Sequence, residues 1–339
     1  MMRKGIVIAL CIMMLATTAV FAAGQKQPAG TDDYKLVLRL SHVFNPAEQL
    51  SKSMDMVAAR ILEKTNGAIE IQVFPQAQLP AYKEGVEQVV RGANFISVED
   101  PSFIGDYVPD FKALYAPMMY RSFDEYVALT KRPVVQKMIA DAEKQGIKIL
   151  SLDYIYGFRN TITKKVIRTP ADLNGQKIRV PATKTYIDTL TAMGAMPTPL
   201  PWGETLAAVK QGVVDGLEGS EFTNHGNKVY ETGALNVANT RHILGTCGVY
   251  ISTTVWNSIP ATYRAIIEEE FVKGAIEGTK ILSDSHASVV KELESFGVKF
   301  NEVDGDAFRR ALAPLYVEQP GMTPGIFAEV FKELDAMRK

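Results

Sequence analysis

The sequence predicts an α/β protein built as two lobes, and three observations support this prediction. Strand-like and helix-like segments alternate from about residue 34 onward, as they do around a parallel sheet. The chain of 339 residues is too long for one ordinary domain and has the length of two. Residues 261–297 contain no proline and keep a helical periodicity, which predicts one helix long enough to run across both lobes.

The first elements form a β-α-β unit. Residues 34–43 alternate between apolar and polar side chains, which is typical of a strand. A helix follows, for which Asn45 is a suitable cap, Pro46 a suitable first residue and Glu48 a suitable partner in a capping box. Residues 68–75 alternate again and predict the second strand.

The alternation continues through the middle of the chain. A helix at 82–92 precedes a strand at 93–100, which ends in two acidic residues. Ser122 and Glu125 have the spacing of a capping box and predict the start of another helix. The later predicted elements are, in order, a helix at 132–146, a strand at 147–160, a capped turn leading into a strand at 176–181, and helices at 183–194 and 203–212.

The long predicted helix contains two glycines, Gly274 and Gly278. Each one costs up to about 1 kcal/mol relative to alanine in a helix interior. We therefore expect either a bend or close packing against a neighbouring element at these positions.

The N-terminus has the layout of a secretory signal peptide. Arg3 and Lys4 precede an apolar run at 6–21, and small residues follow it. The alternative is a membrane anchor, but the run is shorter than the ~20 residues that a membrane-spanning helix needs. We expect residues 1–23 to be removed on export, which predicts a periplasmic protein.

The composition is that of a globular protein, with 47% hydrophobic and 22% charged residues and a net charge of −1. The absence of a basic excess gives no indication of a nucleic-acid partner. Cys11 lies in the predicted signal, so Cys247 remains alone and predicts no internal disulfide. We expect Cys247 to be a small, buried, apolar residue.

The sequence contains none of the common enzyme motifs, such as G-x-S-x-G, the Walker loop, G-x-G-x-x-G or H-E-x-x-H. The four histidines are scattered without the spacing of metal ligands. We therefore expect no catalytic residues, no metal and no cofactor, although a triad assembled in space remains open.

Two arginines come at the ends of predicted strands. Arg179 precedes the proline that ends "QKIRVP", and Arg159 follows "YGF". Ligands of open α/β sheets bind outside the carboxyl ends of strands, and a planar guanidinium matches a carboxylate. A solvated surface charge is the alternative for either residue, but together they favour binding of an organic acid.

Three long blocks resemble a known family. They are "EKTNGAIEIQVFPQAQLP", "GFRNTITKKVIRTPADLNGQKIRVP" and "AMGAMPTPLPWGETLAAVKQGVVDGLE". They resemble the DctP-like extracytoplasmic solute receptors of tripartite ATP-independent periplasmic (TRAP) transporters, over nearly the whole chain from about residue 34. The resemblance implies a class II-like periplasmic-binding-protein fold, whose two lobes close on a ligand above a long helix that underlies both.

We place the lobes by this resemblance. Lobe I is expected to contain residues 34–156 and about 245–275, and lobe II residues 157–244 and about 276–339.

The resemblance also implies roles for individual residues. Arg179 matches the arginine that binds the ligand carboxylate, and Arg159 matches the one that supports it. Trp202 is expected to cover the apolar side of the ligand, with simple core packing as the alternative. The strand ends that carry Ser41, His42 and Glu99 are expected to complete the pocket.

One position departs from the family pattern. Gly219 stands where many members have an asparagine that contacts the ligand, and Leu217 replaces a common glutamine. The missing amide disfavours hydroxyl-rich ligands such as sialic acid and favours a bulkier or more apolar acid. We expect His242 to pack at the hinge.

We therefore interpret the sequence as a periplasmic solute receptor. It is expected to bind a small organic acid between its lobes and to deliver it to an integral-membrane TRAP permease. A ligand sensor without a transport partner and a periplasmic enzyme on the same fold are the alternatives.

Overall fold

The computed structural model describes residues 34–338. The predicted signal peptide, residues 1–23, lies outside this range. Residues from Lys35 to the C-terminus form a single compact unit. No helix among the described residues is long and apolar enough to cross a membrane.

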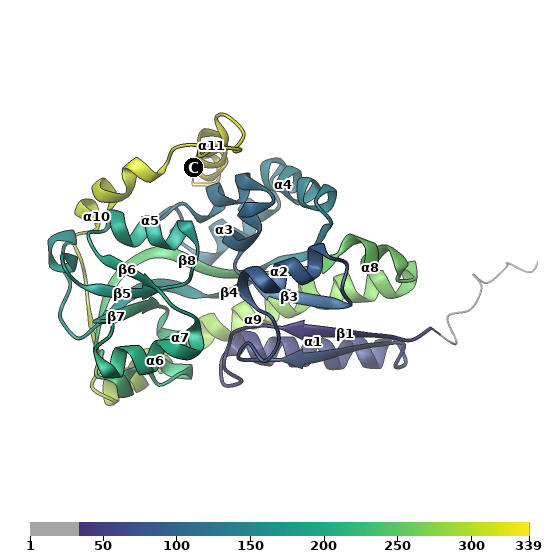
Figure 1. Cartoon of the computed structure of the whole chain (residues 1–339), viewed down its shortest axis with the longest axis horizontal. Helices are drawn as coiled ribbons and strands as arrows, with labels where there is room; N and C mark the ends of the chain where they lie inside the picture. The colour runs from purple at the N-terminus through teal and green to yellow at the C-terminus, as the bar shows by residue number, and fades with distance from the viewer. Residues whose placement is uncertain (1–33, 339) are drawn as a thin grey trace, which may run out of the picture. The chain divides into compact units, whose positions relative to one another are not determined.

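One mixed sheet joins nine strands of the described chain in the order β2-β1-β3-β8-β4-β7-β5-β6, and β9 pairs with β8. The strands are β1 (Leu36–Ser41), β2 (Ile69–Phe74), β3 (Phe95–Glu99), β4 (Ile147–Thr163), β5 (Lys177–Val180), β6 (Met196–Pro199), β7 (Gly216–Gly219), β8 (Asn236–Ser252) and β9 (Lys299–Asn301). The antiparallel pair β4 and β8 is central, because each strand has 17 residues and β8 pairs with β3 on one side while β4 pairs with β7 on the other. Figure 1 shows β1 and β3 on one side of this pair and β5, β6 and β7 on the other.

The register brings the carboxyl ends of the two outer groups toward the middle of β4 and β8. At the end of β3, Glu99 pairs with Gly248, which lies inside β8. At the end of β7, Gly219 pairs with Asn160, which lies inside β4. Ligands of α/β sheets bind outside the carboxyl ends of strands. The fold therefore directs two sets of strand ends at one place.

The helices cover the sheet. They are α1 (Gln49–Lys64), α2 (Tyr82–Val90), α3 (Phe123–Thr130), α4 (Pro133–Lys144), α5 (Lys184–Ala192), α6 (Trp202–Gln211), α7 (Glu221–Gly226), α8 (Thr253–Ser258), α9 (Ala261–Ser295), α10 (Gly305–Leu312) and α11 (Ile326–Met337). Short 3-10 helices η1 (Pro101–Asp106), η2 (Pro109–Tyr115), η3 (Pro170–Leu173), η4 (Val229–Thr232) and η5 (Ala313–Leu315) connect them.

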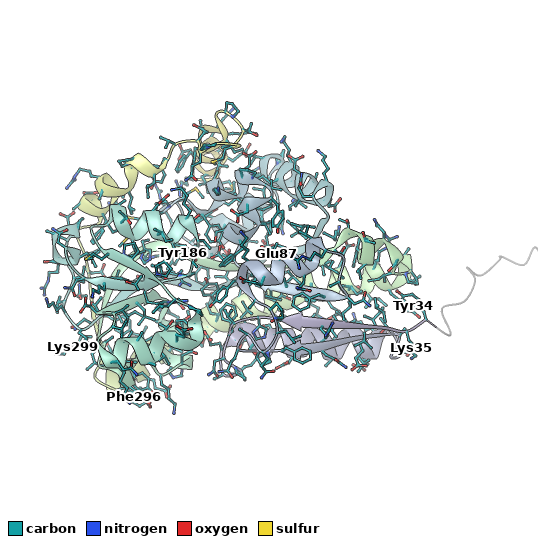
Figure 2. All side chains as sticks on the ribbon, in the orientation of Figure 1. Tyr34, Lys35, Glu87, Tyr186, Phe296 and Lys299 are labelled. Atoms are coloured by element: carbon teal, nitrogen blue, oxygen red, sulfur yellow. The ribbon has the colours of Figure 1, made fainter. Side chains whose placement is uncertain are left out.

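The long helix is confirmed as α9, with 35 residues. It contacts β4, α1 and α7. Helix α1 packs on β2 in one outer group of strands, and α7 directly follows β7 in the other, so α9 extends beneath both groups. Tyr34, where the described chain begins, and Phe296, which caps α9, are labelled on opposite sides of Figure 2. Of the two alternatives for its glycines, the structure shows close packing. A Cβ on Gly274 would lie 2.3 Å from Val57, and one on Gly278 would lie 2.6 Å from Ser53, both on α1.

Two local predictions need correction. The first helix begins at Gln49 rather than near Asn45, because Asn45 and Glu48 close a turn instead. The amide of Asn45 donates to Glu48 Oε2 at 2.9 Å, and its Oδ1 accepts from the amide of Ala47. The long strand β8 was not predicted as a strand at all.

The largest apolar core lies where β4 and β5 meet α3, α4, α5, α10 and α11. A second core packs β7 and α6 against the last turns of α9. These cores hold the strand ends in place around the middle of the sheet.

Candidate ligand-binding site

A cavity of about 60 Å³ lies where the strand ends converge. A single buried water needs roughly 10–15 Å³ on the same scale, so the cavity has room for a small solute. Charged groups in its lining come from both sides of the β4–β8 pair. They are Glu48, Glu99, Asp100, Arg159 and Arg179.

Arg179 on β5 is 2% exposed, yet its guanidinium has no carboxylate within 4.0 Å among the described residues. Its Nε and Nη2 both donate to the carbonyl oxygen of Leu200, at 2.9 and 2.7 Å. Burial lowers the pKa of Arg179, but an arginine keeps its charge in proteins. A full positive charge therefore lines the cavity without a neutralising partner.

An aromatic layer holds this guanidinium in position. The Trp202 ring lies 5.3 Å from the Arg179 Cζ atom, a distance suited to a cation–π interaction. The Trp202 amide donates to the Tyr82 hydroxyl at 2.9 Å, and its Nε1 donates to Asn227 Oδ1 at 3.2 Å. Trp202 thus lines the cavity with both of its polar N–H groups already occupied.

Arg159 on β4 has a different environment. Its Nε and Nη2 form a bidentate pair with the buried carboxylate of Glu218, and Nη1 donates to the Tyr156 hydroxyl at 2.8 Å. Burial raises the pKa of Glu218, but the charge of Arg159 and the neighbouring His242 outweigh it and lower this pKa to about 2. Arg159 and Glu218 therefore form a neutral pair inside the wall of the cavity.

Three carboxyl groups face the same cavity without a cation within 4.0 Å in the described chain. Burial raises the pKa of Glu99 to about 8, that of Glu48 to about 7 and that of Asp100 to about 6. Glu99 accepts from the amide of Tyr82 at 2.6 Å. Asp100 accepts from the Tyr186 hydroxyl at 2.6 Å and from the amide of Ser102 at 2.8 Å. Figure 2 labels Tyr186 on α5.

The backbone at Tyr82 is arranged for its contact with Glu99. Tyr82 has a φ of 55°, a left-handed conformation that is uncommon for a residue with a side chain. Such a conformation persists only where the surroundings hold it, and it occurs often at ligand sites. Here it accompanies two contacts, an amide directed at Glu99 and a hydroxyl directed at Trp202.

The structure brings together four of the residues predicted for the site. Arg179, Arg159, Trp202 and Glu99 all line the cavity. Their roles toward a ligand stay predictions.

The other three residues predicted for the site lie beside the cavity. The Ser41 hydroxyl donates to the Leu79 carbonyl at 3.2 Å, and His42 Nδ1 accepts from the Phe44 amide at 3.2 Å. Val43 and Phe44 line the cavity in their place. Gly219 is buried in β7 outside the lining.

A Cβ at Gly219 would lie 3.6 Å from Thr223, which does line the cavity. A side chain at position 219 would therefore contact a residue of the cavity lining. The preference for a more apolar acid stays a prediction.

Sequence reasoning missed other lining residues, chiefly Glu48, Tyr82, Asp100, Tyr156 and Tyr186. Asp100 carried a signal, because it directly follows Glu99 at a strand end. The tyrosines carried none, since their positions depend on which elements pack together. Cys247 is buried as predicted and also lines the cavity. No group of three or more His, Cys, Asp or Glu side chains within residues 34–338 is placed to hold a metal ion.

Comparison with solved structures gives close matches. A TRAP periplasmic solute binding protein from Desulfovibrio salexigens, in complex with diglycerolphosphate, is 77% identical with a TM-score of 0.89. The match covers 90% of this chain and 98% of that one. A TRAP periplasmic solute binding protein from Fusobacterium nucleatum, with bound sn-glycerol-3-phosphate, is 42% identical with a TM-score of 0.88, covering 89% and 98%.

A more distant neighbour has a different kind of ligand. The TRAP periplasmic solute binding protein from Actinobacillus succinogenes, with bound L-galactonate, is 28% identical over 88% of this chain and 99% of that one, with a TM-score of 0.84. The family of bacterial extracellular solute-binding proteins, family 7 (DctP), matches residues 40–320. The chain belongs to this family and is a solute receptor of the TRAP-transporter type, with the two-lobed α/β fold of its relatives.

Proposed function

We propose that this protein is a receptor for a small organic anion that carries hydroxyl groups, and that a glycerol phosphodiester such as diglycerol phosphate is its preferred ligand. The observation that carries the proposal is Arg179, a buried guanidinium that lines the cavity and has no carboxylate within 4.0 Å in the described chain. A buried charge without a partner is costly. An anionic ligand would neutralise it.

The remaining polar groups suit the hydroxyls of such a ligand. Carboxylates and tyrosine hydroxyls accept hydrogen bonds, and Glu48, Asp100 and Tyr156 all line the cavity beside Arg179. A phosphodiester of glycerol carries a single negative charge in the middle and hydroxyl groups on both arms. One cation flanked by acceptors is a suitable counterpart.

The relatives support a phosphate over a carboxylate. The structures that are 77% and 42% identical contain diglycerolphosphate and sn-glycerol-3-phosphate, whereas the one with L-galactonate is 28% identical. A sugar acid is the second candidate, since Arg179 offers paired donors that match either anion. Both candidates are organic anions, as the sequence predicts, but both carry hydroxyl groups and so differ from the more apolar carboxylic acid expected from Gly219.

Binding would be coupled to closure of the lobes. We place their boundary at the middle of β4 and β8, where Gly157 pairs with Gly245 and the register shifts. Gly157 has a φ of 109°, which favours glycine. Lobe I would hold residues 34–156 and 245–275, and lobe II residues 157–244 and 276–339. A ligand that contacts both lobes shifts the equilibrium toward the closed form, which would then dock on the permease.

The same proposal covers location and chemistry. The chain would be exported by a signal peptide at residues 1–23 and would release its ligand unchanged, without acting as an enzyme. Membership of a solute-binding family supports both statements.

A calorimetric titration tests the proposed ligand class. We would titrate the purified protein with diglycerol phosphate, sn-glycerol-3-phosphate, L-galactonate and glycerol. We expect the phosphodiester to bind most tightly and glycerol to show no heat. Ligand at ~100 times its dissociation constant should also stabilise the protein by about 2.7 kcal/mol in a thermal melt.

The matched variants are Arg179→Ala at the cavity and Arg310→Ala on the exposed face of α10. The first should lose binding, and the second should bind as the wild type does. Tight binding of glycerol, or of a phosphodiester by the Arg179 variant, would contradict the proposal.

A further inference from the structure

We propose that the receptor takes up a proton from the solvent when it binds its ligand, and that Glu99 is the main group that holds it. This inference rests on the proposed function, because it requires an anionic ligand. It concerns the protonation of the protein alone, and no covalent bond of the ligand changes.

The charges around the cavity do not balance when an anion enters. Arg159 and Glu218 already neutralise each other as a bidentate pair. Among the described residues that line the cavity, Arg179 is then the only cation without a carboxylate within 4.0 Å. Glu48, Glu99 and Asp100 line the same cavity, and none of them has a cation within that distance in the described part of the chain. With all three ionised, the ligand would bring a further negative charge into a cavity that is already negative.

Burial and a bound anion both raise the pKa values of these carboxyl groups. Burial raises the pKa of each of the three, to about 8 for Glu99, about 7 for Glu48 and about 6 for Asp100. A nearby anion disfavours the ionised form of a carboxyl group and raises its pKa further. A group that is partly ionised in the empty protein therefore gains a proton when the anion binds.

Glu99 has the least compensation of the three. Within residues 34–338, the amide of Tyr82 is the one group that hydrogen-bonds to its carboxylate, and its chain neighbour Asp100 repels its charge. Asp100 in contrast accepts from the Tyr186 hydroxyl and the Ser102 amide, and it feels the charge of Arg159. The charge of Arg159 also favours ionisation of Glu48, together with contacts from Asn45, Thr223 and Asn227.

Other titratable groups nearby do not replace Glu99 as the proton acceptor. Tyrosine and cysteine side chains here are neutral because burial raises their pKa values, and the arginines stay charged. The titratable and charged groups that face the three carboxyls are Tyr82 and Glu84 on α2, Tyr115 on η2, Tyr126 on α3, Tyr156 and Arg159 on β4, Arg179 on β5, Tyr186 on α5, Glu218 on β7, and Cys247 and Tyr250 on β8.

Protonation also changes what Glu99 can do for the ligand. An ionised carboxylate only accepts hydrogen bonds, whereas a protonated one has an O–H to donate. Protonated Glu99 would therefore be a second donor to the anionic oxygens, beside Arg179. The affinity for anions would depend on pH although the ligand itself does not titrate.

Isothermal titration calorimetry in two buffers tests the inference. A phosphodiester is the right probe, because it stays a monoanion over the range used. We would titrate diglycerol phosphate at pH 8.5 in Tris and in HEPES, which differ in ionisation enthalpy. We expect a buffer-dependent enthalpy that corresponds to proton uptake. The affinity should fall by up to about tenfold per pH unit above pH 8, one decade for each proton taken up.

Two variants locate the proton. Glu99→Gln keeps an uncharged donor of similar size, so it should bind at pH 9 more tightly than the wild type and show less proton uptake. Glu318→Gln removes an exposed carboxyl group outside the cavity and should behave as the wild type does.

The outcomes separate the two proposals. If none of the three anions binds at any pH, the proposed function is wrong. If diglycerol phosphate binds to the wild type with the same enthalpy in both buffers and the same affinity from pH 7 to 9.5, only the proton uptake is wrong. That wild-type result decides the question even if the Glu99 variant does not fold.

Discussion

Arg159 and Arg179 show how two regions of one cavity use the same side chain differently. On β4, Arg159 forms a bidentate ion pair with Glu218 and donates a hydrogen bond to the Tyr156 hydroxyl. On β5, Arg179 is just as buried, but its neighbours are the carbonyl oxygen of Leu200, the Tyr82 hydroxyl and the Trp202 ring, and none of these is a carboxylate. We expect that the partner of a buried charge, more than its burial, distinguishes a structural residue from a binding residue.

The largest expected effect is on the paired side. Arg159→Ala would leave Glu218 buried and ionised without its partner, so we expect the free energy of unfolding to fall by about 3–5 kcal/mol. Urea denaturation measures it. The double variant Arg159→Met/Glu218→Leu removes both charges and should lose less. If Arg159→Ala is as stable as the wild type, the expected structural role of the Arg159–Glu218 pair is wrong.

A substitution of Arg179, which has no carboxylate partner in the described chain, should lower the affinity for the ligand without lowering the stability of the protein. Arg179→Ala is expected to weaken anion binding by about 2–5 kcal/mol, because a charge-assisted contact in a dry site is lost. The unliganded protein should be as stable as before, or more so, since an uncompensated buried charge has gone. Calorimetry and urea denaturation of the same sample provide both values. Equal destabilisation by the two arginine variants would mean that both residues are structural.

The stability of the unliganded protein should vary with pH because of the three carboxyl groups that line the cavity. Glu99, Glu48 and Asp100 have raised pKa values, so the folded protein holds more protons than the unfolded chain above about pH 4. The free energy of unfolding should therefore fall as pH rises toward 8, by up to about 1.4 kcal/mol for each unit by which a pKa is raised. Denaturation curves from pH 5 to 9 test the sign.

The carboxylate of the paired region should respond to pH in the opposite direction. Glu218 has its pKa lowered to about 2, so the stability it contributes is present above its ordinary pKa and is lost as the pH falls toward 2. Glu218→Gln should weaken this acid-side loss and leave the decline between pH 5 and 8 unchanged.

The smallest effect sharpens the description of the Arg179 region. Tyr82→Phe removes the hydroxyl that accepts from the Trp202 amide, at a cost of about 0.5–1.5 kcal/mol. We expect this loss in affinity and in stability alike, since Trp202 positions Arg179. Tyr107→Phe, on a tyrosine outside the cavity lining, is the control for a lost hydroxyl.

Local patterns in the sequence predict much of this fold. Alternation predicts β1 and β2, the Ser122–Glu125 capping box predicts α3, and the proline-free run predicts α9. The sequence does not predict strand β8, because it is buried on both faces over Leu244–Ser252 and its apolar residues therefore do not alternate. Its partners are also distant in the sequence.

The residues of the site also fall into those that the sequence predicts and those that it does not. Arg179 and Glu99 could be predicted because each one ends a strand, and strand ends hold ligands in this kind of sheet. Glu48 was assigned to a helix cap, because its spacing from Asn45 fits a capping box as well as it fits the turn that forms. That Arg159 is neutralised could not be predicted, since Glu218 comes from β7 and meets β4 only through tertiary pairing.

The long pair of strands also has a consequence for how the chain reaches its native state. Strand β3 completes its pairing with β8, where Ile96 meets Ile251, and β4 pairs along nearly the same segment. Contacts between such distant residues slow folding, because the chain must close a long loop before they form. A chain that ends before β8 would leave the edges of β3 and β4 unpaired, and unpaired edges recruit strands from other molecules. Because β8 comes late in the chain, products that end before it are expected to be prone to aggregation.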